Sequence, residues 1–124
     1  MSTTSPERNE LLETSLIETA IESWRFSRAY VRAVTKLDVS EQARFVSQLR
    51  YFLKRLEEQL ETAGLRLVNV EGQMFEPGVA ATAINIAEFS ADESLIVDQM
   101  LEPIIMSGDG VRRAGTVVLR KALV

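Results

Sequence analysis

The sequence contains no cysteine and no histidine among its 124 residues. Without cysteine, disulfide bonds and thiolate metal sites are excluded. Without histidine, the commonest general base and the commonest metal ligand are missing, and catalysis by Ser-His or Cys-His pairs is excluded. We therefore expect a protein that is not an enzyme and holds no cofactor or metal.

A large excess of charge of one sign is also missing. There are 14 Lys and Arg residues against 18 Asp and Glu residues, and the two signs are interspersed except for an acidic stretch at 57–61. No broad basic surface for nucleic acid is expected. No apolar run approaches the ~20 residues that span a bilayer, and the start MSTTSPERNE has neither a basic segment nor an apolar signal core. These patterns predict a cytoplasmic protein that binds neither nucleic acid nor a membrane.

The first half of the chain has apolar residues at helical spacing. One helix is predicted from about Asn9 to Thr35, with one apolar stripe and further apolar residues beside it. A second helix is predicted after Asp38, because Glu41 three residues later completes a pattern typical of a capping box. Gly64 is expected to end it, since glycine takes the left-handed conformation without steric cost. Its apolar seam consists of Val46, Leu49, Leu53, Leu56, Leu60 and Ala63.

Two helices joined by a short break predict an antiparallel hairpin. Phe26, Phe45 and Phe52 lie off the main stripes, so the hairpin has more apolar surface than one partner helix covers. At ~25 cal/mol per Å² of apolar area, exposing such side chains would forgo several kcal/mol. We expect a homodimer in which two hairpins form a four-helix bundle; the alternative is that these side chains pack against the chain's own β half. The expected interface consists of Trp24, Val46, Leu49, Leu53, Leu56 and Leu60.

After Gly64 the hydrophobic period changes to that of strands. LRLVNV, Thr82–Phe89, Leu95–Met106 and GTVVLRKALV are predicted strands, with turns at SADE and at SGDG. Pro103 marks an edge or a bulge, and a short helix over Leu95–Leu101 is an alternative. The predicted class is α+β, with a flexible tail at 1–9, a helical hairpin at 10–64 and a small β domain at 65–124.

The stretch VEGQMFEPGVA at 70–80 predicts an interdomain loop. Gly72 and Gly78 permit sharp changes of direction, and Pro77 fixes the backbone angle φ. Phe75 is expected to anchor the loop between the helical and β parts. Glu76 is expected to cap or pair locally.

The order of these motifs resembles the GrpE family, the nucleotide exchange factors of DnaK-type chaperones. That family ends its second bundle helix near a Leu-x-x-x-Gly turn, continues with a Gly-x-x-Phe-Asp-Pro loop and finishes with Gly-x-x-Leu-Arg-x-Ala-x-Val. The matching residues are Leu60, Gly64, Gly72, Phe75, Glu76, Pro77, Gly110, Gly115, Leu119, Arg120, Ala122 and Val124. The chain departs from the family in five ways. The long N-terminal stalk is missing, the family's His-Glu-Ala is replaced by residues 80–82, and one extra residue lies between Gly115 and Arg120. The small glycine common early in the second bundle helix is absent from QARFVSQLR, and DQMLEPIIM is longer and more apolar than the matching strand region.

The resemblance implies a protein that binds the ATPase domain of a DnaK-type chaperone and promotes ADP release by stabilising the open cleft. Arg120 is the principal expected contact, with Arg112 and Arg113 on the same surface, and Met74 and Met106 as adaptable apolar contacts. Each of these residues has a plainer interpretation, as a solvated cation or a core filler. The departures favour an alternative, a dimeric adaptor or regulatory protein without exchange activity.

Overall fold

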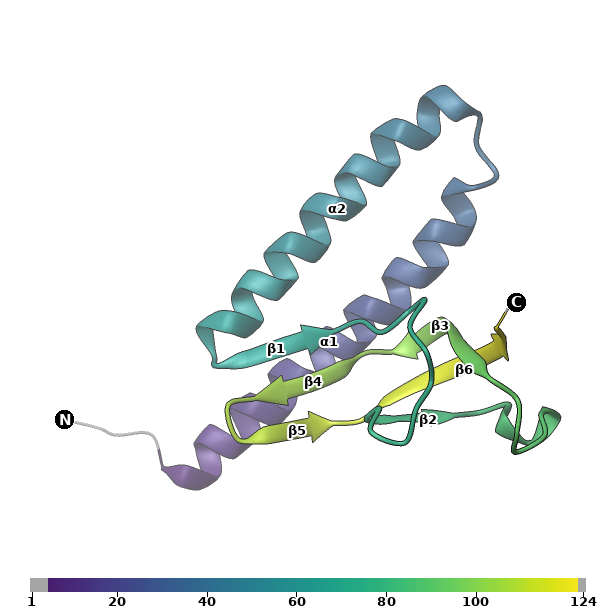
Figure 1. Ribbon diagram of the computed structural model, residues 1–124. Coiled ribbons are helices and arrows are strands. Elements are labelled where there is room, and N and C mark those ends of the chain that lie inside the picture. The colour runs from purple at the N-terminus through teal and green to yellow at the C-terminus, as the bar shows by residue number, and fades with distance from the viewer. Residues whose placement is uncertain (1–4, 123–124) are drawn as a thin grey trace. The chain divides into compact units, whose positions relative to one another are not determined.

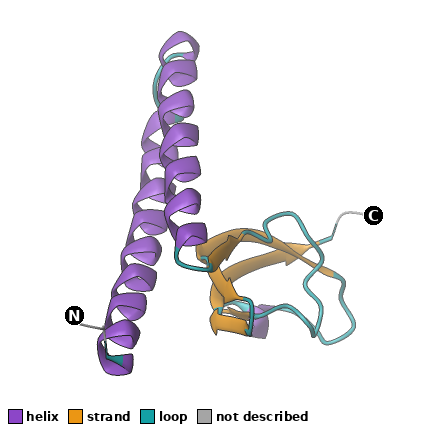
Figure 2. Cartoon of the chain, turned by 90° about the vertical axis from the view of Figure 1, so that its left-hand side faces the viewer, coloured by secondary structure: helices purple, strands orange, loops and turns teal. Residues whose placement is uncertain are grey.

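The chain forms two units. The structure is a computed structural model that describes residues 5–122 (Figure 1). It divides after Gly64 into a helical unit and a β unit, and Figure 2 shows helices confined to the first apart from one short turn. The α+β class is therefore confirmed. Val124 of the resemblance lies outside the described residues.

Helix α1 spans Pro6–Val34 and begins earlier than predicted. The Ser5 side chain accepts a hydrogen bond from the Arg8 backbone N–H at 3.1 Å, and Pro6 occupies the first helical position, where its missing N–H costs nothing. These start signals make residues 6–9 helical rather than part of the predicted tail. The rest of that tail, residues 1–4, lies outside the described residues.

Helix α2 spans Val39–Thr62 and has the predicted ends. The Asp38 carboxylate accepts hydrogen bonds from the Glu41 backbone N–H at 3.0 Å and from the Ser40 hydroxyl at 2.9 Å. These bonds, the first above all, lower the pKa of Asp38 because they stabilise its charged form. At the other end Gly64 has a φ of 76° and donates its N–H to the Glu61 carbonyl at 2.9 Å. Both the cap and the left-handed glycine are thus confirmed.

The β unit is built around one long, bent hairpin. Strands β3 (Leu95–Glu102) and β4 (Ile104–Ser107) form one arm, and β5 (Gly110–Arg113) and β6 (Gly115–Lys121) form the other. The two arms keep one register across the bend, because Glu102 pairs with Thr116 and Ile105 pairs with Arg113. Figure 1 shows both arms running through the unit.

Two short strands complete two three-stranded sheets. Strand β1 (Leu65–Val68) pairs antiparallel with β4 and gives the sheet β1-β4-β5. Strand β2 (Ala81–Ala83) pairs parallel with β6 and gives the sheet β2-β6-β3. The central strands β4 and β6 are therefore paired on both edges. The buried apolar residues of this unit are Leu65, Val70, Leu95, Val97, Met100, Ile104, Ile105, Val117 and Leu119.

Three predictions for the β half need correction or refinement. Leu95–Leu101 is a strand, so the helical alternative is wrong. Pro103 lies buried between β3 and β4, where its lack of an N–H interrupts the ladder. The predicted strand Thr82–Phe89 is limited to β2, and a single 3₁₀ turn, η1 (Ile86–Glu88), follows it. The reversal at SGDG is confirmed, with Gly110 at a φ of 125°.

Candidate partner-binding face

One side of the sheet β2-β6-β3 gathers part of the predicted contact residues. Along β6, Val117 and Leu119 are buried, whereas Val118 and Arg120 alternate with them and face outward. On β3, Ile96 pairs with Arg120, and Asp98 is exposed nearby. We call the side formed by Met74, Ile96, Asp98, Val118 and Arg120 the outer face.

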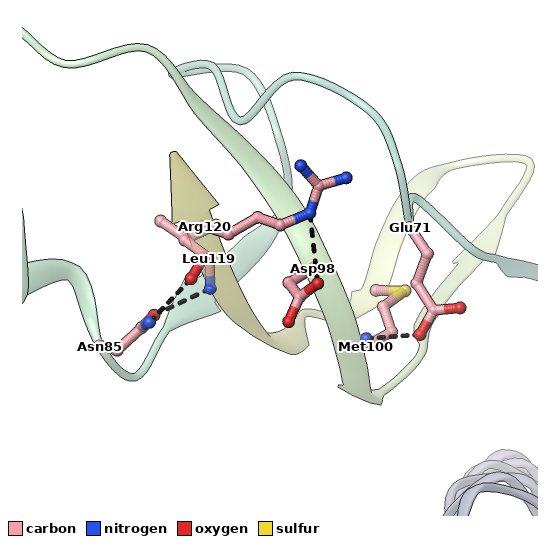
Figure 3. Close-up of polar contacts among 6 residues, drawn as sticks. All are labelled: Glu71, Asn85, Asp98, Met100, Leu119 and Arg120. Carbon is pink, nitrogen blue, oxygen red and sulfur yellow. Dashed lines mark hydrogen bonds and ion pairs between the residues drawn. The ribbon is translucent and has the colours of Figure 1, made fainter. Parts of the chain in front are cut away.

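Arg120 forms an ion pair across the two strands of this face. Its Nε lies 3.3 Å from the Asp98 Oδ1, and the two side chains are 45% and 43% exposed. Figure 3 shows the two terminal guanidinium nitrogens pointing away from Asp98. A half-exposed pair of this kind contributes at most about 1 kcal/mol to stability. The pair therefore orients Arg120 and leaves the planar end of its guanidinium accessible.

The predicted interdomain loop lies within the β unit and extends the sheet. Gly72 N–H donates to the Val97 carbonyl at 2.8 Å, Val97 N–H donates to Gln73 at 2.9 Å, and Phe75 N–H donates to Leu95 at 2.9 Å. These bonds cover the edge of β3 as a short additional strand would. The joint between the units falls instead at Gly64, where the chain passes from α2 to β1.

The loop also places Met74 beside the arginine. Met74 forms an isolated bridge with Ile96, which pairs on its other side with Arg120. Directly opposed residues share one side of a sheet, so Met74, Ile96 and Arg120 form a row. Glu76 closes the loop through its backbone, because its carbonyl accepts from Val79 N–H at 3.0 Å with Pro77 inside the turn.

Met106, Arg112 and Arg113 belong to the other sheet. Met106 pairs with Arg66 of β1, and the Arg66 guanidinium lies 3.8 Å from the Met106 sulfur. Arg113 pairs with Ile105, whereas Arg112 is the extra residue at an irregularity in the β4–β5 register. The structure therefore divides the predicted contact residues into two sets, Met74 with Arg120 on one sheet and Met106 with the two arginines on the other.

Two polar residues that sequence reasoning missed support the outer face. The Asn85 side chain accepts from Leu119 N–H and donates to the Leu119 carbonyl, both at 2.9 Å (Figure 3). The Asn85 side chain thus makes the two hydrogen bonds to β6 that a backbone strand would make past the end of β2. The Glu71 carboxylate accepts from Met100 N–H at 2.8 Å, next to the irregularities in the β3 register. For Asn85, the signal in the sequence was a single asparagine within an alternating apolar run.

The turn before β3 is held by a carboxylate. Glu93 accepts from the Ser90 N–H at 2.8 Å and the Ser90 hydroxyl at 2.9 Å, and lies 3.0 Å from the Lys121 ammonium. The Ser90 backbone bond first, and the bond from Lys121 second, lower the pKa of Glu93 from 4.5 to about 2. This turn anchors β3 to β6 at the end where Arg120 lies.

The predicted dimer-interface residues have different degrees of exposure in the single chain. Trp24 is 2% exposed and Leu60 is 0% exposed. The Arg28 guanidinium stacks 4.2 Å from the centre of the Trp24 ring. Val46 is exposed. The residues Leu49, Leu53 and Leu56 are partly exposed.

The helical unit carries an apolar groove between its two helices. A hollow of about 210 Å³ is lined by Phe26, Ser27, Tyr30, Gln48, Leu49 and Phe52. The Tyr30 hydroxyl donates to the Phe45 carbonyl at 3.3 Å, which ties α1 to α2 beside it. Phe26 is 68% exposed and Phe52 is 42% exposed. We call this hollow the central groove.

Comparison with protein-family models, with curated proteins and with solved structures found no match for the chain. Within residues 5–122, no group of three or more acidic side chains is placed to hold a metal ion. No helix in the same range is long and apolar enough to cross a membrane.

Proposed function

We propose that this protein is a GrpE-like co-chaperone that binds the ATPase domain of a DnaK-type chaperone through the outer face and promotes ADP release. The observation that carries the proposal is the role of the glycines in the resemblance. Gly64, Gly72 and Gly110 have φ angles of 76°, 83° and 125°. Residues other than glycine rarely adopt such positive φ angles. These three motif glycines therefore lie at turns whose backbone angle favours glycine.

The outer face has the properties of a protein contact surface. Arg120 offers two outward nitrogens in a planar fork, which matches a partner carboxylate. Ile96 and Met74 add apolar area next to it. The Asn85 and Glu93 bonds fix β6 and β3 beneath this row. A rigid face lowers the entropic cost of binding, because little has to be ordered on contact.

Exchange needs no covalent chemistry by this chain. A protein that binds the open, nucleotide-free conformation of an ATPase more tightly than the closed one shifts the population toward the open cleft. About 1.4 kcal/mol of differential affinity shifts that ratio tenfold. The proposal therefore requires no histidine, cysteine or metal.

The test measures release of fluorescently labelled ADP from a DnaK-type chaperone, together with the affinity of the complex. The wild-type chain is expected to bind and to accelerate release. Arg120→Ala is expected to weaken binding roughly thirtyfold, as for an interface arginine that contributes about 2 kcal/mol. Arg50→Ala, which removes an exposed arginine of α2, serves as the matched control and is expected to bind normally.

The outcomes separate the proposal from its alternative. Absence of binding by the wild-type chain would refute the co-chaperone proposal. Binding without faster release would favour the adaptor. If Arg112→Ala or Arg113→Ala abolishes binding while Arg120→Ala does not, the contact lies on the sheet β1-β4-β5. The homodimer is part of the proposal, and the mass in solution at micromolar concentration tests it.

A further inference from the structure

The sheet β1-β4-β5 places a methionine sulfur beside a guanidinium. Met106 of β4 is directly opposite Arg66 of β1, and the Arg66 Nη2 lies 3.8 Å from the Met106 Sδ. Arg66 is exposed and Met106 is partly exposed. On its other side Met106 pairs with Val111, which is 49% exposed. Because directly opposed residues share one side of a sheet, the three side chains form a row that solvent reaches.

Two further methionines lie within the described residues, and their surroundings differ. Met100 is 0% exposed, and its sulfur accepts a hydrogen bond from the Val70 backbone N–H at 3.4 Å. Met74 is 43% exposed and belongs to the outer face of the other sheet. An oxidant must touch the sulfur to react with it. Met74 and Met106 are therefore accessible to a dissolved oxidant, whereas Met100 is protected by the fold.

We propose that Met106 is a site of reversible oxidation by hydroperoxides, and that Arg66 holds the sulfoxide oxygen formed there. The thioether sulfur attacks the terminal oxygen of the peroxide, so that a sulfur–oxygen bond forms and the oxygen–oxygen bond breaks. The sulfur is oxidised by two electrons and the peroxide is reduced by two. The transferred oxygen gives its proton to the departing alkoxide or hydroxide, which leaves as alcohol or water. The proposal does not depend on the co-chaperone function, because Met106 lies outside the outer face.

The guanidinium favours the product over the starting thioether. A thioether sulfur is a weak hydrogen-bond acceptor, whereas a sulfoxide oxygen is a strong one, and bonds from a charged donor are roughly twice as strong as neutral ones. The new oxygen is attached to a sulfur that already lies 3.8 Å from Arg66 Nη2. A small rotation of the Met106 side chain therefore brings this oxygen within hydrogen-bond distance of Arg66.

The consequence is a change of surface without loss of the sheet. Methionine oxidation commonly disrupts an apolar contact, because it converts an apolar side chain into a polar one. At Met106 a cationic donor for the new oxygen is already in position on the neighbouring strand. Methionine sulfoxide reductases restore methionine. In a chain without cysteine, this row can therefore record exposure to a hydroperoxide reversibly.

The first experiment maps oxidation in the folded chain. The protein is treated with hydrogen peroxide, and the sulfoxide fraction at each methionine is followed by peptide mass spectrometry. Met106 is expected to react at least about tenfold faster than Met100, because Met100 is reached only when the β unit opens. Treatment with methionine sulfoxide reductases should then return Met106 to methionine. Equal rates at Met100 and Met106, or a Met106 sulfoxide that resists reduction, would overturn the proposal.

The second experiment measures whether Arg66 holds the oxygen. All variants carry Met74→Leu, which removes the other accessible methionine of the β unit. Amide hydrogen exchange in β1 and β4 is compared before and after peroxide, with Arg66 and with Arg66→Leu, which removes the donors of an exposed side chain. Oxidation should change the exchange rates by less than about threefold with Arg66, and accelerate them roughly tenfold with Arg66→Leu, as for the loss of one charge-assisted hydrogen bond.

A matched control isolates the effect of Met106. Met106→Leu on the same Met74→Leu chain keeps an apolar side chain of similar volume, and its exchange rates should not respond to peroxide. A response in this control would show that the effect arises elsewhere and would count against the site. Equal acceleration with and without Arg66 would overturn the assignment of Arg66 as the group that holds the sulfoxide.

Discussion

Replacing Gly115 by alanine is expected to destabilise the β unit and leave the helical unit unchanged. Gly115 is the first residue of β6, next to the bend of the long hairpin. A Cβ atom at this position would lie 2.8 Å from the Met100 Cε, 2.9 Å from the Glu102 carbonyl oxygen and 3.0 Å from the Ile104 Cγ1. Carbon atoms in favourable contact are about 3.5–4.0 Å apart, so the new methyl group overlaps three neighbours.

The cost can be bounded from these neighbours. Met100 is 0% exposed, and the Glu102 carbonyl oxygen is a backbone atom of the facing strand, which cannot move by a side-chain rotation. Relief therefore requires β3 and β6 to separate. Overpacking of a buried site costs about 1–3 kcal/mol. For a unit of this size, about 2 kcal/mol lowers the melting temperature by roughly 8–16 °C.

The measurement has to report on the β unit alone. Trp24, Tyr30 and Tyr51 are all in the helical unit, so intrinsic Trp and Tyr fluorescence follows the helices. Amide hydrogen exchange at Val117 and Leu119 follows the sheet, and it should become faster in Gly115→Ala. Gly78→Ala is the matched control, because a Cβ there meets no atom within 4 Å. Equal protection in the two variants would refute the steric argument.

Two further predictions concern polar groups of the β unit. Asn85→Ala removes both hydrogen-bond partners of the Leu119 backbone and should destabilise the unit by about 1–3 kcal/mol. Asn85→Asp keeps the acceptor for the Leu119 N–H but places a second oxygen against the Leu119 carbonyl. Wild-type protection of the Leu119 amide from hydrogen exchange in either variant would count against this role. Glu93 has its pKa lowered from 4.5 to about 2, so its stabilising contribution is full above about pH 4.5 and is lost as the pH falls toward 2. In urea unfolding, Glu93→Gln should be less stable than wild type at pH 6 and should converge with it near pH 2; a pH-independent difference would exclude the linkage.

The features that could be predicted from the sequence are those set by neighbours along the chain. Asp38 caps α2 through a bond to Glu41 three residues away, and Gly64 ends α2 through its own φ angle. The Asp109-Gly110 reversal is equally local. In each case the physical cause lies within one turn of chain, and the residue type alone identifies it.

The features that could not be predicted depend on which strands meet. The loop at Gly72 pairs with Val97, and Asn85 binds Leu119 at a separation of 34 residues. Nothing in the residues near Asn85 identifies that partner. The ion pair of Arg120 likewise depends on the β3 irregularity beside Asp98, which sets where that carboxylate lies. For the same reason the outer face was only partly anticipated, through Arg120 and Met74.

The position of β6 in the middle of its sheet has a consequence during synthesis on the ribosome. Strands β2 and β3 both pair with β6, and Ala83 precedes its partner Val117 by 34 residues. At about 5–20 residues per second, those residues take roughly 2–7 s to be added. Within that interval Val97 and Met100 are made 22 and 17 residues before their partners Leu119 and Val117 in β6, whereas both helices are already complete. The nascent β half is therefore the stage at which this chain is most exposed to aggregation and most dependent on chaperones.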